Sequence, residues 1–118
     1  MKIAIGCDPN AENEKQALMK FIENKGLGKV TDFGSTDPIY ANVAIKVGEA
    51  VASKEYDRGI LLCGTGLGVS IAANKVKGAY AALLTDAYSA ERARLSNDAN
   101  IACMGAFTTG SKERELFT

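Results

Sequence analysis

The chain has 118 residues, of which 47% are hydrophobic and 24% charged, and its fourteen basic and fourteen acidic side chains leave no formal net charge at pH 7. This length and composition indicate one soluble globular domain without a signal peptide or membrane helix, and the balanced charge gives no reason to expect nucleic acid or an anionic membrane surface as a partner. The three cysteines have no paired spacing, as is usual in a reducing compartment, so we expect a cytoplasmic protein.

The first half of the chain predicts two strand–helix units. A mainly apolar run from Lys2 to Cys7 predicts a buried strand, which Pro9 ends. Asn10 is a plausible N-cap for an amphipathic helix from Ala11 to Lys25, closed by Gly26. The elements expected next are a short strand from Lys29 to Phe33, a turn or loop from Gly34 to Pro38, and a helix from Tyr40 to near Ser53.

The second half repeats the alternation of strand and helix. A buried strand from Arg58 to Cys63 stops at a glycine-rich loop, and a small-residue helical segment from Val69 to Ala73 follows. Asp86 is a suitable cap for a later helix. The other expected elements are a strand from Ala79 to Leu84, a helix from Ala87 to about Leu95, a strand from Asn100 to Met104, and a loop with the start of a final helix between Gly105 and Thr118.

Strands that alternate with helices predict a parallel sheet with right-handed crossovers and helices on both faces. We therefore expect an α/β fold, namely a single three-layer Rossmann-like or flavodoxin-like domain with a five-stranded parallel sheet. The sequence shows no internal repeat, linker or low-complexity tract. The domain is expected to span residues 1–118, with a final helix that is short or truncated.

Three glycines at alternate positions, Gly64, Gly66 and Gly68, separate the third strand from its helix. Such a loop lets backbone N–H groups approach a ligand, and the start of the following helix favours negative charge. A nucleotide cofactor is not expected, because no Lys-Ser or Lys-Thr follows the last glycine and neither register of the dinucleotide pattern places a third glycine correctly. A simple tight turn is the structural alternative.

Cys63 is the first candidate for chemistry, because open α/β sheets bind ligands at the carboxyl ends of their strands. A helix start beside a thiol favours the thiolate, which acts as a general base or nucleophile. Cys103, inside a predicted strand, is interpreted as core. Cys7 and Asp8 end the first strand, which should lie beside the third, so these two residues and Cys63 form an alternative candidate for a metal site.

Other charged and polar residues have plainer interpretations. A loop-capping carboxylate is the structural alternative for Asp8. The chain has no histidine, which weakens the case for a metal site. The charged faces Glu12–Lys15 and Glu91–Arg94 are interpreted as solvated helix surfaces.

The stretch Cys63-Gly-Thr-Gly-Leu-Gly-Val-Ser-Ile-Ala-Ala-Asn-Lys75 resembles the signature of the type B ribose-5-phosphate isomerases and the galactose-6-phosphate isomerase subunits. Further matches are Ile3-Ala-Ile-Gly-Cys-Asp8, Pro38-Ile-Tyr40-Ala41, Ser89-Ala90 and Asn97-Asp-Ala-Asn100. The resemblance covers the chain from Met1 to about Gly110. It implies a Rossmann-like domain that forms homodimers or larger oligomers with shared active sites, and aldose–ketose isomerisation of a phosphorylated sugar through a cis-enediolate without metal or organic cofactor.

The resemblance also assigns roles to residues. Cys63 would move the proton between C1 and C2, Thr65 would assist proton transfer at the oxygens, and Asp8 would contact the sugar hydroxyls or ring oxygen. Backbone N–H groups from Gly64 to Ser70 would bind the developing negative charge. Tyr40 would line the site, Asn97 would reach it from a partner subunit, and Ser96 is a further candidate for substrate binding.

The sequence departs from the family pattern at several positions. Pro9 stands where a histidine usually follows the first-strand aspartate, Ser96 replaces the histidine thought to open the sugar ring, and Phe107 replaces an arginine that helps to hold phosphate. Lys112 and Arg114 are the cations left near the chain end. Three interpretations follow: a substrate that needs no ring opening, such as a tetrose phosphate; a sugar-phosphate-binding subunit that a different partner chain completes; or a truncated protein with damaged activity.

Overall fold

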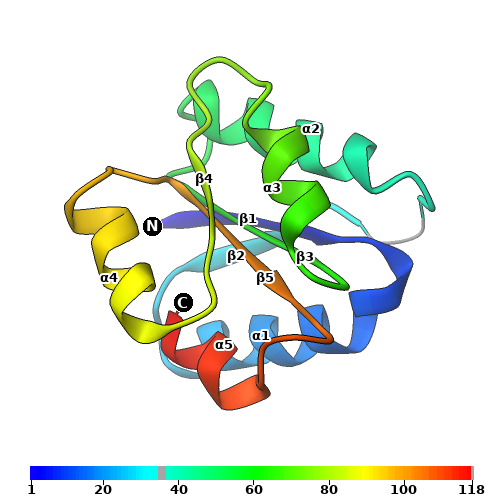
Figure 1. The fold of residues 1–118 in the computed structure, drawn as a ribbon, viewed down its shortest axis with the longest axis vertical. Coiled ribbons are helices and arrows are strands. Elements are labelled where there is room, and N and C mark those ends of the chain that lie inside the picture. The colour runs from blue at the N-terminus through cyan, green and yellow to red at the C-terminus, as the bar shows by residue number, and fades with distance from the viewer. Residues whose placement is uncertain (35–36, 118) are drawn as a thin grey trace.

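The computed structural model describes residues 1–34 and 37–117, so Ser35 and Thr36 of the expected Gly34–Pro38 loop, and Thr118, lie outside the described residues. It confirms the predicted fold class, with five parallel strands in the order β2-β1-β3-β5-β4 and helices on both faces (Figure 1). The strands are β1 (Lys2–Cys7), β2 (Lys29–Asp32), β3 (Arg58–Cys63), β4 (Ala81–Leu83) and β5 (Ile101–Gly105).

Two hydrophobic cores lie on the two sides of the sheet. The helices α2 (Tyr40–Ala52) and α3 (Leu67–Ala73) cover one face, whereas α1 (Glu12–Asn24), α4 (Ala87–Leu95) and α5 (Ser111–Phe117) cover the other (Figure 1). Alternate residues of β1, β3 and β5 belong to different cores, as Leu61 and Leu62 of β3 do, and both are fully buried. This alternation gives the expected three layers.

The start of the first helix differs from the prediction. A short 3₁₀ turn, η1 (Pro9–Ala11), precedes α1, and its cap is Asp8, whose carboxylate accepts a hydrogen bond from the Asn10 amide at 3.0 Å. Asn10 is therefore not the N-cap. Pro9 stands at the first helical position, where its fixed φ and missing N–H suit a helix start, so the residue before it is the cap.

The edge strand β4 covers Ala81–Leu83 instead of the predicted Ala79–Leu84, and two asparagine side chains bind the backbone at its start. Asn74 donates to the Ala81 carbonyl at 2.9 Å and accepts from the Ala81 amide at 2.8 Å. The side chain of Asn100 accepts from the Tyr80 amide at 2.8 Å. These amide groups supply the hydrogen bonds that a neighbouring strand would otherwise make. No helix in the described part of the chain is long and apolar enough to cross a membrane.

Candidate active site at the carboxyl edge of the sheet

The strands β1 and β3 are neighbours, as expected, and their carboxyl ends form the centre of the site. Cys7 pairs with Leu62, and the Asp8 amide donates to the Leu62 carbonyl at 3.2 Å. The strand order reverses here, since β2 lies on one side of β1 and β3 on the other. Open α/β sheets bind ligands at such a switch point, so Asp8 and Cys63 lie at the position where a ligand is expected.

The Cys63 sulfur lies at the start of α3. Its side chain is nearly buried, and the sulfur accepts a hydrogen bond from the Gly66 amide at 3.0 Å. Gly66 has a φ of +84°, and a Cβ there would lie 2.7 Å from the Leu83 side chain and 3.0 Å from the Met104 backbone. Glycine is therefore required here by backbone conformation and by space. The Gly66 N–H thus points at the Cys63 sulfur, beside the start of α3.

The glycine loop presents several backbone donors, although fewer than the sequence predicts. The Leu67 amide donates to the Thr65 hydroxyl at 3.3 Å, and the Ser70 amide donates to the Gly66 carbonyl at 3.2 Å. The Ser70 hydroxyl donates to the Leu67 carbonyl at 2.7 Å, so Ser70 is engaged within α3. Among the described residues, no acceptor binds the remaining loop amides, which belong to Gly64, Thr65, Gly68 and Val69.

Aromatic rings lie against two of the loop glycines. The ring of Tyr40, at the start of α2, is so close to Gly68 that a Cβ added there would lie 2.5 Å from it. The ring of Phe107 lies against Gly64, where a Cβ would be 3.0 Å away, and the Phe107 amide donates to the Gly64 carbonyl at 2.9 Å. Tyr40 thus lies beside the loop. Phe107 is 73% exposed, so the edge of the site carries a large apolar ring.

Asp8 lies at this edge with its side chain half-buried. The hydrogen bond to Asn10 gives it the capping role that was the structural alternative. One carboxylate oxygen makes that bond, and the other has no hydrogen bond or ion pair among the described residues. Asp8 can therefore cap η1 and still accept a hydrogen bond from a ligand.

The structure does not bring Ser96 and Asn97 to Cys63 within one chain. Ser96 ends α4, and Asn97 lies four residues before β5 begins at Ile101. Cys63 pairs with Gly105, the last residue of β5. Ser96 and Asn97 therefore lie at the amino ends of the strands, whereas Cys63 lies at their carboxyl ends.

The other two cysteines are structural. Cys7 is packed in the core on the α1 side of the sheet, whereas Cys63 belongs to the core on the α2 side. Burial is the largest effect on the pKa of the Cys7 thiol, which rises to about 12, and burial also raises the pKa of Cys103. Cys103 is fully buried, as predicted. No group of three or more potential metal ligands occurs among the described residues.

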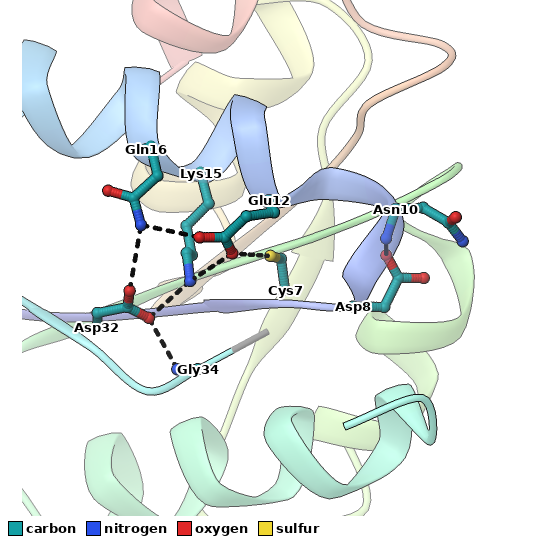
Figure 2. A network of polar contacts seen from close by, with 8 residues as sticks. All are labelled: Cys7, Asp8, Asn10, Glu12, Lys15, Gln16, Asp32 and Gly34. Carbon is teal, nitrogen blue, oxygen red and sulfur yellow. Dashed lines mark hydrogen bonds and ion pairs between the residues drawn. The ribbon is translucent and has the colours of Figure 1, made fainter. Parts of the chain in front are cut away.

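Lys15 was missed by the sequence analysis, which placed Glu12–Lys15 on a solvated surface. Its side chain is only 1% exposed and forms ion pairs with Glu12 at 2.9 Å and Asp32 at 2.8 Å (Figure 2). The signal was helical spacing, because Lys15 lies three residues before Leu18 and seven before Ile22, the other buried residues of α1. Interpreting the charge alone placed it on the wrong side of the helix.

A parallel α/β domain with a thiol and a glycine loop at its switch point defines a ligand-binding protein of the Rossmann-like class. Residues 3–118 match the family model described as Ribose/Galactose Isomerase, so the chain belongs to that family of aldose–ketose isomerases, as the sequence resemblance indicates.

Individual relatives agree with this assignment. The chain is 50% identical over 113 residues to the ribose-5-P isomerase B of Listeria innocua, an alignment that covers 93% of this chain and 76% of the relative. It is 46% identical over 119 residues to the D-erythrulose-4-phosphate isomerase 2 of Mycolicibacterium smegmatis, with the same coverage. The structure of ribose-5-phosphate isomerase B from Clostridium thermocellum superposes with a TM-score of 0.90 and 44% identity, over 97% of this chain and 78% of that one.

Proposed function

We propose that this protein interconverts an aldose phosphate and its ketose phosphate, of the ribose 5-phosphate and ribulose 5-phosphate type, through a cis-enediolate with Cys63 as the base. The observation that carries the proposal is the Cys63 sulfur at 3.0 Å from the Gly66 amide at the carboxyl end of β3. A base held beside backbone donors suits removal of a proton next to a carbonyl group, because the donors stabilise the negative charge that develops on oxygen.

The proposed reaction needs three groups from the chain. The Cys63 thiolate takes the proton from C2 of the open-chain aldose and returns it to C1, while Thr65 assists proton transfer between O1 and O2. Unoccupied amides of the glycine loop bind the enediolate oxygen, and Asp8 orients a sugar hydroxyl. Because the Ser70 amide and hydroxyl are used within α3, its proposed role is limited to holding the loop. No metal or organic cofactor is required in this scheme.

A tetrose phosphate is the second candidate substrate. Ribose 5-phosphate closes a furanose ring through its C4 hydroxyl, whereas in an aldotetrose 4-phosphate that oxygen carries the phosphate and this ring cannot form. Pro9 and Ser96 stand where the resemblance expects histidines, one of them thought to open the ring. A substrate without a ring would need no such group, and one relative is named for a tetrulose phosphate.

We also propose that a partner subunit completes the site and that the protein acts in the cytoplasm. The exposed apolar side chains around the glycine loop support the first point, since an obligate interface buries such groups. Tyr40, Leu67, Ile71 and Phe107 are 42%, 52%, 61% and 73% exposed. A homodimer is the simplest assembly, and a hetero-oligomer in which this chain only binds the sugar phosphate is the alternative.

Proton exchange in D₂O tests the proposal directly. The protein is incubated separately with ribose 5-phosphate, erythrose 4-phosphate and a hexose 6-phosphate, and deuterium at C2 is followed by NMR beside a Cys63→Ala control. We expect exchange with one sugar phosphate and a loss of at least ~100-fold in the control, which lacks the general base. Exchange that survives the substitution would contradict the role of Cys63. No exchange with any sugar would favour the partner-dependent, binding-only alternative.

A further inference from the structure

A cluster of charged side chains with a buried lysine at its centre lies beside Cys7 (Figure 2), which belongs to the core on the opposite face of the sheet from Cys63. Lys15 of α1 is at its centre, with Glu12 one turn earlier and Asp32 at the end of β2. Gln16 donates to Glu12 at 3.0 Å and to Asp32 at 3.4 Å. The cluster therefore joins a helix to the end of an edge strand of only four residues.

Two sets of contacts connect Lys15 to Cys7, the last residue of β1. In the first, Glu12 binds Lys15 and also lies 3.9 Å from the Cys7 sulfur, whose thiol donates to it. In the second, Asp32 binds Lys15 at 2.8 Å and accepts from the Gly34 amide at 2.8 Å, and the Gly34 carbonyl accepts from the Cys7 amide at 3.2 Å. Both sets of contacts begin at the Lys15 ammonium group. One ends at the side chain of Cys7 and the other at its backbone amide.

The position of Cys7 determines the position of Asp8. Asp8 is the next residue, and its own amide binds the Leu62 carbonyl of β3, one residue before Cys63. A shift at the end of β1 or in the loop at Gly34 would therefore move the Asp8 carboxylate relative to the Cys63 thiol.

We propose that Lys15 is a positioning residue for the isomerase site, acting through Cys7 and Gly34 on Asp8. The inference rests on the proposed function, because it gives Lys15 a consequence for catalysis through a residue proposed to contact the sugar. Misplacing a substrate-orienting group by about 1 Å can reduce a rate by ~100-fold. The cluster is thus part of the catalytic geometry, although none of its side chains touches substrate.

The charge of Lys15 is maintained inside the protein. Burial acts to lower the pKa of Lys15, but the hydrogen bonds to Asp32 and Glu12 outweigh it, so the pKa lies above its ordinary value. The thiol of Cys7 stays protonated at neutral pH and serves only as a donor. The ammonium group with its two carboxylates is therefore a fixed support rather than a proton donor in the reaction.

Lys15→Met is the test variant, because methionine has a similar length and the side chains of Glu12 and Asp32 are 42% and 33% exposed, so their carboxylates can remain hydrated. Leu18→Ala is the matched control: it truncates the next buried residue of α1 without touching the polar cluster. Both are assayed well below their unfolding temperatures. We expect Lys15→Met to lower kcat/KM by about 10- to 100-fold, and Leu18→Ala to leave it within about threefold.

A double-mutant cycle separates positioning from general destabilisation. If Lys15 acts through Asp8, Lys15→Met in an Asp8→Asn background should cost less than about threefold in kcat/KM, because coupled residues are not additive. A full loss in that background would overturn the proposal, as would equal losses in Lys15→Met and Leu18→Ala. Asp32→Asn, which keeps an oxygen for the Gly34 amide, gives the same cycle if Lys15→Met does not fold.

A readout without activity distinguishes this inference from the proposed function. In ¹⁵N-labelled protein, we expect Lys15→Met to shift the amide resonances of Asp8 and Gly34, and Leu18→Ala to leave them in place. If the wild-type chain turns over none of the three sugar phosphates, the proposed function fails, and these shifts still decide whether Lys15 positions the end of β1. Unchanged resonances would overturn the positioning role.

Discussion

Burial determines the protonation of Cys7 and Cys103, and this has a consequence for stability. Both thiols have a pKa raised above the ordinary value of 9.0 by burial, to about 12 for Cys7. The folded chain therefore keeps two protons that the unfolded chain loses above pH 9. By linkage, the stability they contribute is complete below pH 9 and is lost as the pH rises towards the folded-state values.

Alkaline pH should thus destabilise the protein in a specific way. Between pH 9 and 10 we expect the free energy of unfolding to fall by up to ~1.4 kcal/mol per pH unit for each of these thiols. Urea unfolding at pH 8, 9 and 10 measures this slope. The Cys103→Ala variant should show a shallower slope than the wild type. Identical slopes would mean that the Cys103 thiol titrates alike in both states.

The glycines of the loop differ in what they tolerate. A Cβ at Gly66 would strain a left-handed φ and lie 3.0 Å from the Met104 backbone, which cannot move without distorting β5. The three atoms nearest to a Cβ at Gly68 all belong to the side chain of Tyr40, a residue that is 42% exposed. Gly66→Ala should therefore reduce the free energy of unfolding by about 1–3 kcal/mol.

Gly68→Ala should cost less than ~1 kcal/mol in stability, since the side chain it displaces is partly exposed to solvent. If Tyr40 lines the sugar site, the same variant should raise KM. Urea unfolding and steady-state kinetics of the two alanine variants test both statements together. A larger stability loss for Gly68→Ala than for Gly66→Ala would contradict the argument from φ and backbone contact.

Among the elements, the edge strand β4 receives backbone hydrogen bonds from a side chain on the side where it has no neighbouring strand. Asn74, at the end of α3, forms two hydrogen bonds with the backbone of Ala81. Removing them should cost about 1–3 kcal/mol, because a typical hydrogen bond contributes ~0.5–1.5 kcal/mol to stability. We expect Asn74→Ala to lower stability by this amount and to speed hydrogen exchange at the Ala81 amide. Asn13→Ala, on the exposed side of α1, is the control and should change neither.

The elements that the sequence predicts well are those in which hydrophobic spacing and chain punctuation agree. The bounds of β1 and β3 are as predicted, α2 begins at Tyr40, and Asp86 caps α4 through the Ser89 amide at 2.7 Å. These features depend on neighbours in the sequence, so a local pattern is enough to find them.

The differences between the predicted and the observed structure arise from contacts between residues that are distant in the sequence. Just before β4, the Tyr80 amide is bound by Asn100, twenty positions later, and the burial of Lys15 depends on Asp32 of another element. At the site, the local motif correctly predicts that a strand ends at Cys63 and that a loop and a helix follow it. It could not indicate that the Ser70 hydroxyl binds within its own helix, because that outcome requires the geometry of the turn.

At the scale of the whole molecule, the residues of the proposed site lie partly at the carboxyl ends of the strands and partly at their amino ends. Asn97 precedes β5, and Cys63 pairs with the last residue of that strand. The five residues of β5 separate its amino end from its carboxyl end by roughly 16 Å, at ~3.3 Å per residue. Asn97 therefore cannot contact a substrate held at Cys63 of its own chain. If it takes part in the reaction, a second subunit must present it.

Subunit mixing tests this division. The Cys63→Ala and Asn97→Ala variants should each be nearly inactive as homodimers. When they are mixed and allowed to exchange, half of the dimers carry both variants, and one of the two sites in each has an intact Cys63 and an intact Asn97. Activity should then rise to about a quarter of the wild-type value, as random pairing in a two-fold symmetric dimer predicts.

A mixture of Cys63→Ala with Thr65→Ala is the matched control, because both substitutions lie in the glycine loop of the same chain. Each site of such a mixed dimer keeps one defect, so no activity should return. Equal activity in both mixtures would contradict a shared site, and Asn97 would then have no part in the reaction at the partner's Cys63. Restoration confined to the first mixture would mean that the catalytic unit is the dimer, with each sheet edge incomplete until a second chain covers it.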